Sequence, residues 1–196
     1  RKYDGSGNEI WTRQFGTSDS DGATGVAVDP SNNVYVACVT TGTLPGQTSS
    51  GGNDAFVRKY DGSGNEIWTR QFGTSDSDGA TGVAVDPSNN VYVACVTTGT
   101  LPGQTSSGGN DAFVRKYDGS ENEIWTRQFG TSDYDSTSGV AVDPSNNVYV
   151  AGYTYGTLPG QLSSGGTDAF LVKFVQPAPA PVGGIAFPAD KLALLA

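Results

Sequence analysis

A repeat of 57 residues accounts for almost the whole of this sequence. Residues 1–57 and 58–114 are identical at every position, and residues 115–171 differ from them at eleven positions. The start of a fourth copy follows and stops at Phe174. Such a period marks a chain built from copies of one supersecondary unit, each of which buries its apolar surface against its neighbours. The chain must therefore fold as a row of equivalent units.

Each unit contains four short runs rich in β-branched and aromatic residues, of the kind that form strands. Tight turns with the sequences PSNN and DGSGN alternate with longer loops rich in Gly, Ser and Thr. In the first complete unit, the predicted strands are Gly25–Asp29, Val34–Thr40, Asp54–Tyr60 and Glu66–Phe72.

A unit of four antiparallel strands and fixed length is typical of a β-propeller blade. A solenoid is the rival architecture, although its repeats usually carry only one or two short strands. We therefore predict an all-β fold of β-propeller-type blades, each with four antiparallel strands, in three 57-residue repeats with offset ends. The repeats occupy residues 1–175, a Pro/Ala linker occupies 176–182, and an apolar tail occupies 183–196.

The motifs DAFVRKYDGSGNEIW and GVAVDPSNNVYVA, followed by a Gly/Thr loop, resemble the bacterial and archaeal β-propeller repeat of large secreted and surface proteins. This resemblance implies an extracellular or cell-surface location and supplies no catalytic residues. The tail resembles the segment before a C-terminal membrane helix in surface proteins of some archaea. Its LALLA stretch is too short to span a bilayer, which needs about 20 apolar residues. We expect a membrane anchor in a full-length precursor or, alternatively, docking of LALLA on another subunit.

Composition excludes several classes of function. The chain has no His and a net charge of −9. It cannot build a Ser-His-Asp triad or a His-ligated zinc site, and its charge argues against binding nucleic acid. Every Asp recurs at the same place in each unit, which favours structural roles over an asymmetric active site. We therefore predict a protein that is not an enzyme.

Aspartate-rich turns raise the question of calcium. The DGSGNE and DPSNN turns have the residues that tight turns need for their own hydrogen bonds, and neither matches the EF-hand pattern. Asp19 and Asp21 in the GTSDSDG loop are a better pair of candidate ligands. We predict no cofactor and leave calcium open at this loop. Cys38 and Cys95 occupy the same place in adjacent units, and we predict buried thiols, with a disulfide as the alternative.

The ends of the repeat array are out of step with the blades. Arg1–Tyr3 corresponds to the end of a third strand, Glu9–Phe15 to a fourth strand, and Asp168–Phe174 to a third strand with nothing after it. Propellers have about four to eight blades, so three cannot close, and open edges favour association. The chain is either a fragment of a longer array or assembles with itself by strand exchange, as a ring or a filament. The exchanged strand would consist of Glu9, Ile10, Trp11, Thr12, Arg13, Gln14 and Phe15.

The third repeat departs from the other two chiefly by gaining large side chains. These are Tyr134, Tyr153, Tyr155 and Leu162. Tyr is common at recognition surfaces because it is large, fairly rigid and amphipathic. We predict a contact patch for a partner subunit or a glycan, or alternatively a cap on a terminal blade. Trp11, Trp68 and Trp125 either cover the seams between blades or form a repeated stacking platform for sugars.

The sequence therefore predicts a non-enzymatic extracellular structural module that assembles with copies of itself through its incomplete blades. The alternative is a carbohydrate-binding, lectin-like propeller module.

Overall fold

All of the secondary structure is β-strand in the computed structural model, which describes residues 1–175. The linker and tail predicted for 176–182 and 183–196 lie outside the described residues. The strands are β1 (Lys2–Tyr3), β2 (Glu9–Trp11), β3 (Asp21–Val28), β4 (Val34–Thr40), β5 (Asp54–Tyr60), β6 (Glu66–Phe72), β7 (Asp78–Val85), β8 (Val91–Thr97), β9 (Asp111–Tyr117), β10 (Glu123–Phe129), β11 (Asp135–Val142), β12 (Val148–Thr154) and β13 (Asp168–Phe174).

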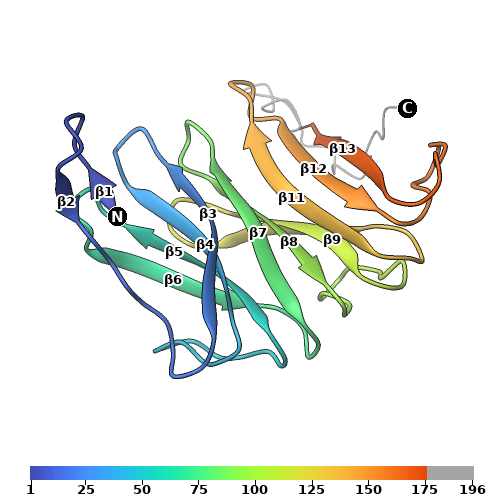
Figure 1. The fold of residues 1–196 in the computed structure, drawn as a ribbon, viewed down its shortest axis with the longest axis horizontal. Helices are drawn as coiled ribbons and strands as arrows, with labels where there is room; N and C mark the ends of the chain where they lie inside the picture. Colours follow the sequence, from blue (N-terminus) through green and yellow to red (C-terminus); the bar gives the residue numbers. More distant parts are fainter. Residues whose placement is uncertain (176–196) are drawn as a thin grey trace, which may run out of the picture.

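Consecutive strands pair antiparallel to form three blades. Blade 1 is the sheet β3-β4-β5-β6, blade 2 is β7-β8-β9-β10, and blade 3 is the three-stranded sheet β11-β12-β13. The blades lie in an open row, with the two-stranded ribbon β1-β2 at one end and β13 at the other (Figure 1). The predicted all-β fold with four-stranded antiparallel blades is confirmed.

The first strand of each blade is longer than the sequence predicted. It begins at Asp21 rather than Gly25, because Asp21 pairs with Thr40 and Gly22 with Val39. An irregularity between Ala23 and Gly25 lets the strand pair on both sides of a shift in register. Small polar residues that look like a loop in the sequence are therefore part of the sheet.

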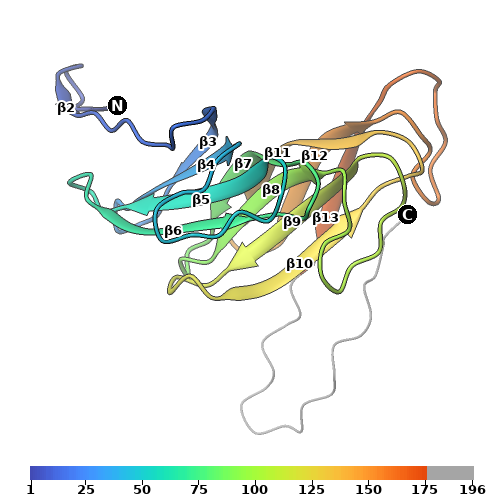
Figure 2. The same cartoon turned by 90° about the horizontal axis from the view of Figure 1, so that it is seen from below.

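The leading strand is shorter than predicted. Only Glu9–Trp11 is a strand, and it pairs with Lys2–Tyr3 of the same chain. The equivalent strand β6 pairs with β5 along its whole length. A strand needs a partner for its backbone groups, and β1 offers two residues. The ribbon lies at the blade 1 end of the row and forms a sheet separate from that blade (Figure 2).

The tight turns are held by aspartate side chains. Asp29 Oδ1 accepts hydrogen bonds from the backbone N–H groups of Ser31 and Asn33, both at 2.9 Å. Its Oδ2 accepts from Asn33 Nδ2 at 2.8 Å and from the Tyr35 hydroxyl at 3.1 Å. Asn32 takes a positive φ of 64°, which Asn tolerates better than most residues. The predicted turn role of these aspartates is therefore confirmed.

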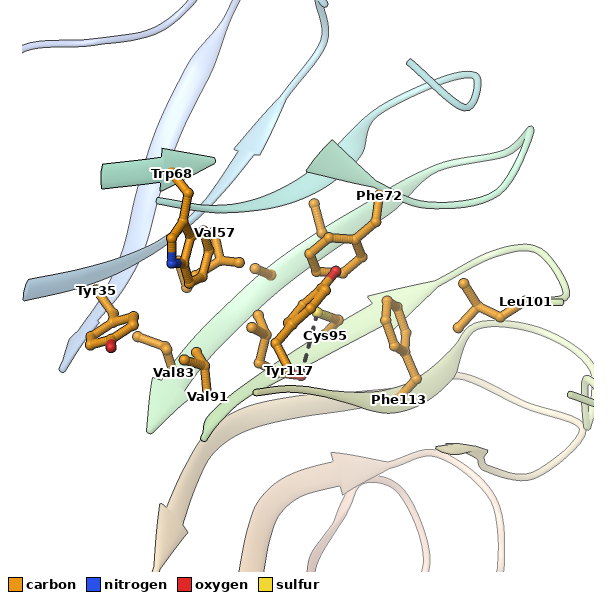
Figure 3. Packing of buried hydrophobic residues seen from close by; sticks show 14 residues of the cluster. Tyr35, Val57, Trp68, Phe72, Val83, Val91, Cys95, Leu101, Phe113 and Tyr117 are labelled. Atoms are coloured by element: carbon orange, nitrogen blue, oxygen red, sulfur yellow. Dashed lines mark hydrogen bonds between the residues drawn. The ribbon is translucent and has the colours of Figure 1, made fainter. Parts of the chain in front are cut away.

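Neighbouring blades pack through an aromatic seam. Trp68 and Phe72 of blade 1 lie against Tyr117, with ring centroids 6.5 and 5.9 Å away (Figure 3). Trp125 lies 6.0 Å from Phe174 at the next seam. The fourth strand of one blade thus covers the third strand of the next. The predicted seam role of the tryptophans is confirmed for these two residues.

The leading segment Glu9–Phe15 repeats this packing on the free side of blade 1. Phe15 lies 6.2 Å from Phe56 and 5.7 Å from Tyr60, and Trp11 lies 6.4 Å from Tyr60. Arg58 stacks over the Phe15 ring at 4.8 Å. Glu9–Phe15 therefore packs on blade 1 as β6 packs on blade 2.

Candidate interaction surface

The outer face of blade 1 exposes apolar side chains whose equivalents in blade 2 are buried or partly buried. Val26 is 66% exposed and Val28 is 58% exposed. Val83, the equivalent of Val26 in blade 2, is only 8% exposed because blade 1 covers it. The difference comes from the neighbour alone, since the two repeats have the same sequence.

The outer face of blade 3 shows the complementary half of the same pattern. Leu171 is 70% exposed, whereas its equivalents Val57 and Val114 are completely buried against the following blade. Tyr149 is half-buried, whereas its equivalent Tyr35 is fully buried. The two exposed end faces of the row thus correspond to the two sides of the seam between blade 1 and blade 2.

An open groove of about 940 Å³ runs along β13. Its walls come from the end of β10, the loop between β12 and β13, and β13 itself. It occupies the side of β13 on which β6 lies in blade 1. The predicted contact residue Leu162 is 96% exposed and lines this groove.

The structure brings three of the predicted contact residues together. The ring centroids of Tyr134, Tyr153 and Tyr155 lie 5.4–6.1 Å from each other, and Tyr134 and Tyr153 are nearly parallel at 15°. The Tyr155 N–H donates to the Tyr134 carbonyl at 2.9 Å. Burial, followed by hydrogen bonding to Tyr153, raises the pKa of the Tyr134 hydroxyl. We call these three residues the tyrosine cluster; Leu162 lines the separate groove.

The tyrosine cluster lies at the edge where a following blade would pack. Its member Tyr153 replaces Val39 of blade 1. Val39 faces blade 2, since a Cβ added at Gly79 would lie 3.8 Å from its Cγ2. Tyr153 therefore occupies a seam position on a face that the described chain leaves uncovered.

Residues of the predicted exchange strand are held by their own chain only in part. Trp11 Nε1 donates to the Gly62 carbonyl at 3.2 Å, and Arg13 Nε donates to the Gly64 carbonyl at 2.6 Å. Glu9 pairs with Arg1 at 2.9 Å. The exposed residues of this segment are Glu9, Ile10, Thr12, Arg13 and Gln14, whereas Trp11 and Phe15 are partly buried. Thr12–Phe15 has no strand partner within residues 1–175.

The carboxylates do not gather into a metal cage in the part of the chain that the structure describes. No group of three or more Asp, Glu, Cys or His side chains is arranged as metal ligands there. At the calcium candidate loop, Asp21 Oδ2 accepts from the Thr17 backbone N–H at 2.6 Å and from its hydroxyl at 3.1 Å. Asp19 and Asp21 thus have different surroundings, and the first of them is exposed.

Sequence reasoning missed a pair of buried aspartates that flank Gly73. A Cβ added at Gly73 would lie 2.6 Å from both Asp54 Oδ1 and Asp78 Oδ2. Burial raises the pKa of Asp78, and the nearby Asp54 charge adds to the rise. The pair recurs as Asp111 and Asp135. Only the fixed spacing between the two Asp positions in each unit could have signalled it.

The architecture and the exposed seam faces define an open array of propeller blades. The chain belongs to the β-propeller repeat family, whose sequence pattern it matches at residues 10–44, 67–101 and 124–159. A regulatory protein of Caulobacter vibrioides, FlaEY, is 32% identical in an alignment 159 residues long that covers 74% of this chain. An uncharacterized WD repeat-containing protein of Acanthamoeba polyphaga mimivirus, L264, is 28% identical in an alignment 141 residues long that covers 63% of this chain.

These relatives are much longer proteins. The chain covers 17% of FlaEY and 10% of L264. Among solved structures, an apocarotenoid oxygenase of Synechocystis aligns over 81% of this chain and 37% of its own, with 13% identity and a TM-score of 0.47. Within residues 1–175, no helix is long and apolar enough to cross a membrane.

Proposed function

We propose that this chain is a non-enzymatic extracellular structural module that assembles end to end with copies of itself. Blade 3 of one copy packs on blade 1 of the next. The leading strand of the second copy then becomes the fourth strand of the first copy's blade 3. The observation that carries the proposal is that the two exposed faces are the two halves of a seam already present twice in each chain.

Apolar burial favours this joint. Val26, Val28 and Leu171 are more than half exposed in the single chain. Their equivalents in the internal seams are buried or partly buried, so an end-to-end joint would cover them in the same way. Burying a Val or Leu side chain fully is worth about 1.5–3 kcal/mol.

Strand pairing also favours the joint. The β1-β2 ribbon makes two register pairs, whereas β6 makes six with β5. Transfer of Glu9–Phe15 to β13 of another copy would replace two pairs by six. The transfer gives up the Arg1–Glu9 ion pair, which is exposed and contributes little to stability.

Three further observations support the remaining parts of the proposal. The recurrence of each Asp in every unit favours structural over catalytic roles. The resemblance to repeats of secreted and surface proteins favours an extracellular location. Cys38 and Cys95 are buried free thiols, so an oxidising compartment would leave them unreacted.

The test is the mass of the purified chain in solution, by light scattering coupled to size exclusion, with electron microscopy of the same sample. We expect a ring or a filament, and two chains would bring six blades. Val26→Lys and Leu171→Lys place a charge in the joint and should dissociate the assembly. Thr105→Lys adds the same charge to an exposed loop and serves as the matched control. A compact monomer of 20.2 kDa at micromolar concentration would contradict self-assembly.

Carbohydrate binding is a second candidate function, favoured by the tyrosine cluster. Tyr155 is 56% exposed, and it lies beside two nearly parallel rings. Aromatic faces of this kind stack on apolar ligand surfaces. A glycan array with the wild-type chain and a Tyr153→Ala, Tyr155→Ala variant tests this candidate. Binding that disappears in the variant supports it.

A further inference from the structure

A glutamine side chain fixes the fourth strand of blade 1 to the rest of that blade. Gln71 Oε1 accepts a hydrogen bond from the Leu44 N–H at 2.9 Å. Gln71 Nε2 donates to the Gly42 carbonyl at 2.8 Å and to Asp54 Oδ2 at 2.7 Å. The Gln71 backbone N–H donates to Gln47 Oε1 at 3.1 Å. One glutamine thus makes four hydrogen bonds with the long loop and the start of β5. We call the four partner groups the glutamine socket.

Blade 2 repeats the glutamine socket. Gln128 Oε1 accepts from the Leu101 N–H at 3.0 Å. Its Nε2 donates to the Gly99 carbonyl at 2.9 Å and to Asp111 Oδ2 at 2.7 Å. Its backbone N–H donates to Gln104 Oε1 at 3.1 Å. The same residue types make the same four bonds, so the socket is a built feature of the unit.

Blade 3 has all four residues of the glutamine socket. They are Gly156, Leu158, Gln161 and Asp168, and each of them lines the groove along β13. Within residues 1–175, β13 pairs with β12 alone. The described chain therefore offers a third socket without a fourth strand beside it.

One hydrogen bond in blade 3 differs from the other blades in an informative way. The Ser163 hydroxyl donates to Asp168 Oδ2 at 2.8 Å. In blade 1 the equivalent Ser49 hydroxyl donates to the Gly51 carbonyl instead, and the aspartate accepts from the glutamine amide. The serine hydroxyl in blade 3 thus takes the place of the amide donor. If the Ser163 side chain changed rotamer, Asp168 Oδ2 could accept a hydrogen bond from a glutamine amide, as Asp54 Oδ2 does in blade 1.

Gln14 is the residue of the leading strand that matches this socket. It stands at the position of Gln71 and Gln128 in the repeat, and it is exposed. Its neighbours Trp11 and Phe15 hold the segment on blade 1. If blade 3 of another copy docks there, the repeat geometry places Gln14 beside β13 of that copy.

We infer that Gln14 of one copy enters the glutamine socket of blade 3 in another copy and so determines the register and partner of the exchanged strand. This inference rests on the proposed self-assembly and names the residue that makes it specific. Of the four hydrogen bonds expected in this socket, two join Gln14 to neutral backbone groups and one joins it to the charged Asp168 carboxylate. Hydrogen bonds to charged groups are the stronger kind.

The experiment compares the assembly constant of the full chain with that of Gln14→Ala by sedimentation. Because Gln14 is exposed in the single chain, the substitution should not change the thermal unfolding temperature of the chain. We expect the dissociation constant to rise about 10- to 100-fold, since several hydrogen bonds of roughly 1 kcal/mol each are lost. A double-mutant cycle with Asp168→Ala should show coupling between the two sites, because the equivalent bond in blade 1 joins the Gln71 side-chain amide to the Asp54 carboxylate. The matched control is Thr105→Ala, at an exposed loop position.

A peptide of residues 8–16 gives a second measurement. It should bind the full chain and inhibit assembly, and its Gln14→Ala form should do so at least tenfold less well. Assembly that is equally strong in the Gln14→Ala chain would overturn this inference and leave the proposed function standing. A chain that stays monomeric at all concentrations would overturn both.

Discussion

At the scale of single residues, Glu121 is the clearest case of conflict between side chain and backbone. It has a φ of 68° at a position where Gly7 and Gly64 have 83°. A side chain with a Cβ is strained there by about 1 kcal/mol or more. Its carboxylate pairs with Arg70 of blade 1 at 3.4 Å, and both side chains are partly exposed. Such a pair recovers only part of the strain.

Glu121→Gly should therefore stabilise the chain. We expect the free energy of unfolding to rise by about 0.5–1 kcal/mol, measured by chemical denaturation. Glu121→Ala, which removes the ion pair and keeps the strained φ, is the control and should not stabilise. A loss of stability in the glycine variant would mean that the Arg70 pair outweighs the strain.

The two cysteines should be unreactive in the folded chain. Burial raises the pKa of the Cys38 thiol to about 12 and that of Cys95 well above its usual value. The thiolate is the reactive form, so at pH 8 almost none is present. We expect a thiol reagent to label neither residue in the native state and both in denaturant. Rapid native labelling would contradict the burial of these positions.

At the scale of turns and strands, the aspartates in the tight turns make the free energy of unfolding depend on pH. Burial opposes ionisation of Asp29, yet hydrogen bonds from Asn33 and Tyr35 outweigh it and lower its pKa below 3.8. The ionised form therefore stabilises the fold above pH 3.8, and this contribution is lost as the pH falls through the lower folded-state pKa.

Asp29→Asn should remove this part of the pH dependence. We expect the variant to be less stable than wild type at pH 7, by about 1 kcal/mol, because a neutral amide accepts the turn hydrogen bonds less well. The gap should narrow between pH 4 and pH 2. Urea unfolding at each pH measures it, and a gap that widens in acid would show that the pKa shift has the opposite sign.

Local patterns predicted most of the strands, and pairing between distant segments explains the misses. Val34–Thr40 and Asp54–Tyr60 match their predicted bounds because alternation and turn residues define both ends. The start of β3 and the end of β2 depend on the partner strand, which no local pattern reveals.

The candidate surface was predictable to a similar degree. Three substitutions in the third repeat did mark a cluster of tyrosines in space. Leu162, singled out by the same comparison, lines the groove instead. The glutamine socket was missed because Gly42, Leu44 and Gln47 look like ordinary loop positions and Asp54 looks like the first residue of a strand.

At the scale of the whole molecule, the tyrosine cluster sets what an end-to-end joint looks like. Val39 lies against Gly79 in the first internal seam. The equivalent residues in the second internal seam are Val96 and Ser136. A joint to a second copy would place Tyr153 opposite Gly22 of that copy. Gly22 has only a Val39 methyl group within 4 Å of an added Cβ, so its backbone is accessible to a large ring.

Reverting the cluster to the sequence of the other repeats tests whether it joins copies or caps the row. The variant carries Tyr134→Ser, Tyr153→Val and Tyr155→Thr. It should fold normally, because blades 1 and 2 fold with these residues, and its thermal unfolding serves as the control. We expect assembly to weaken about tenfold, since the tyrosines contribute more contact area to the joint than the residues that replace them. Sedimentation at several concentrations measures the change. Stronger assembly in the variant would instead show that the tyrosines evolved as a cap, which limits the growth of the row by making blade 3 unlike its neighbours.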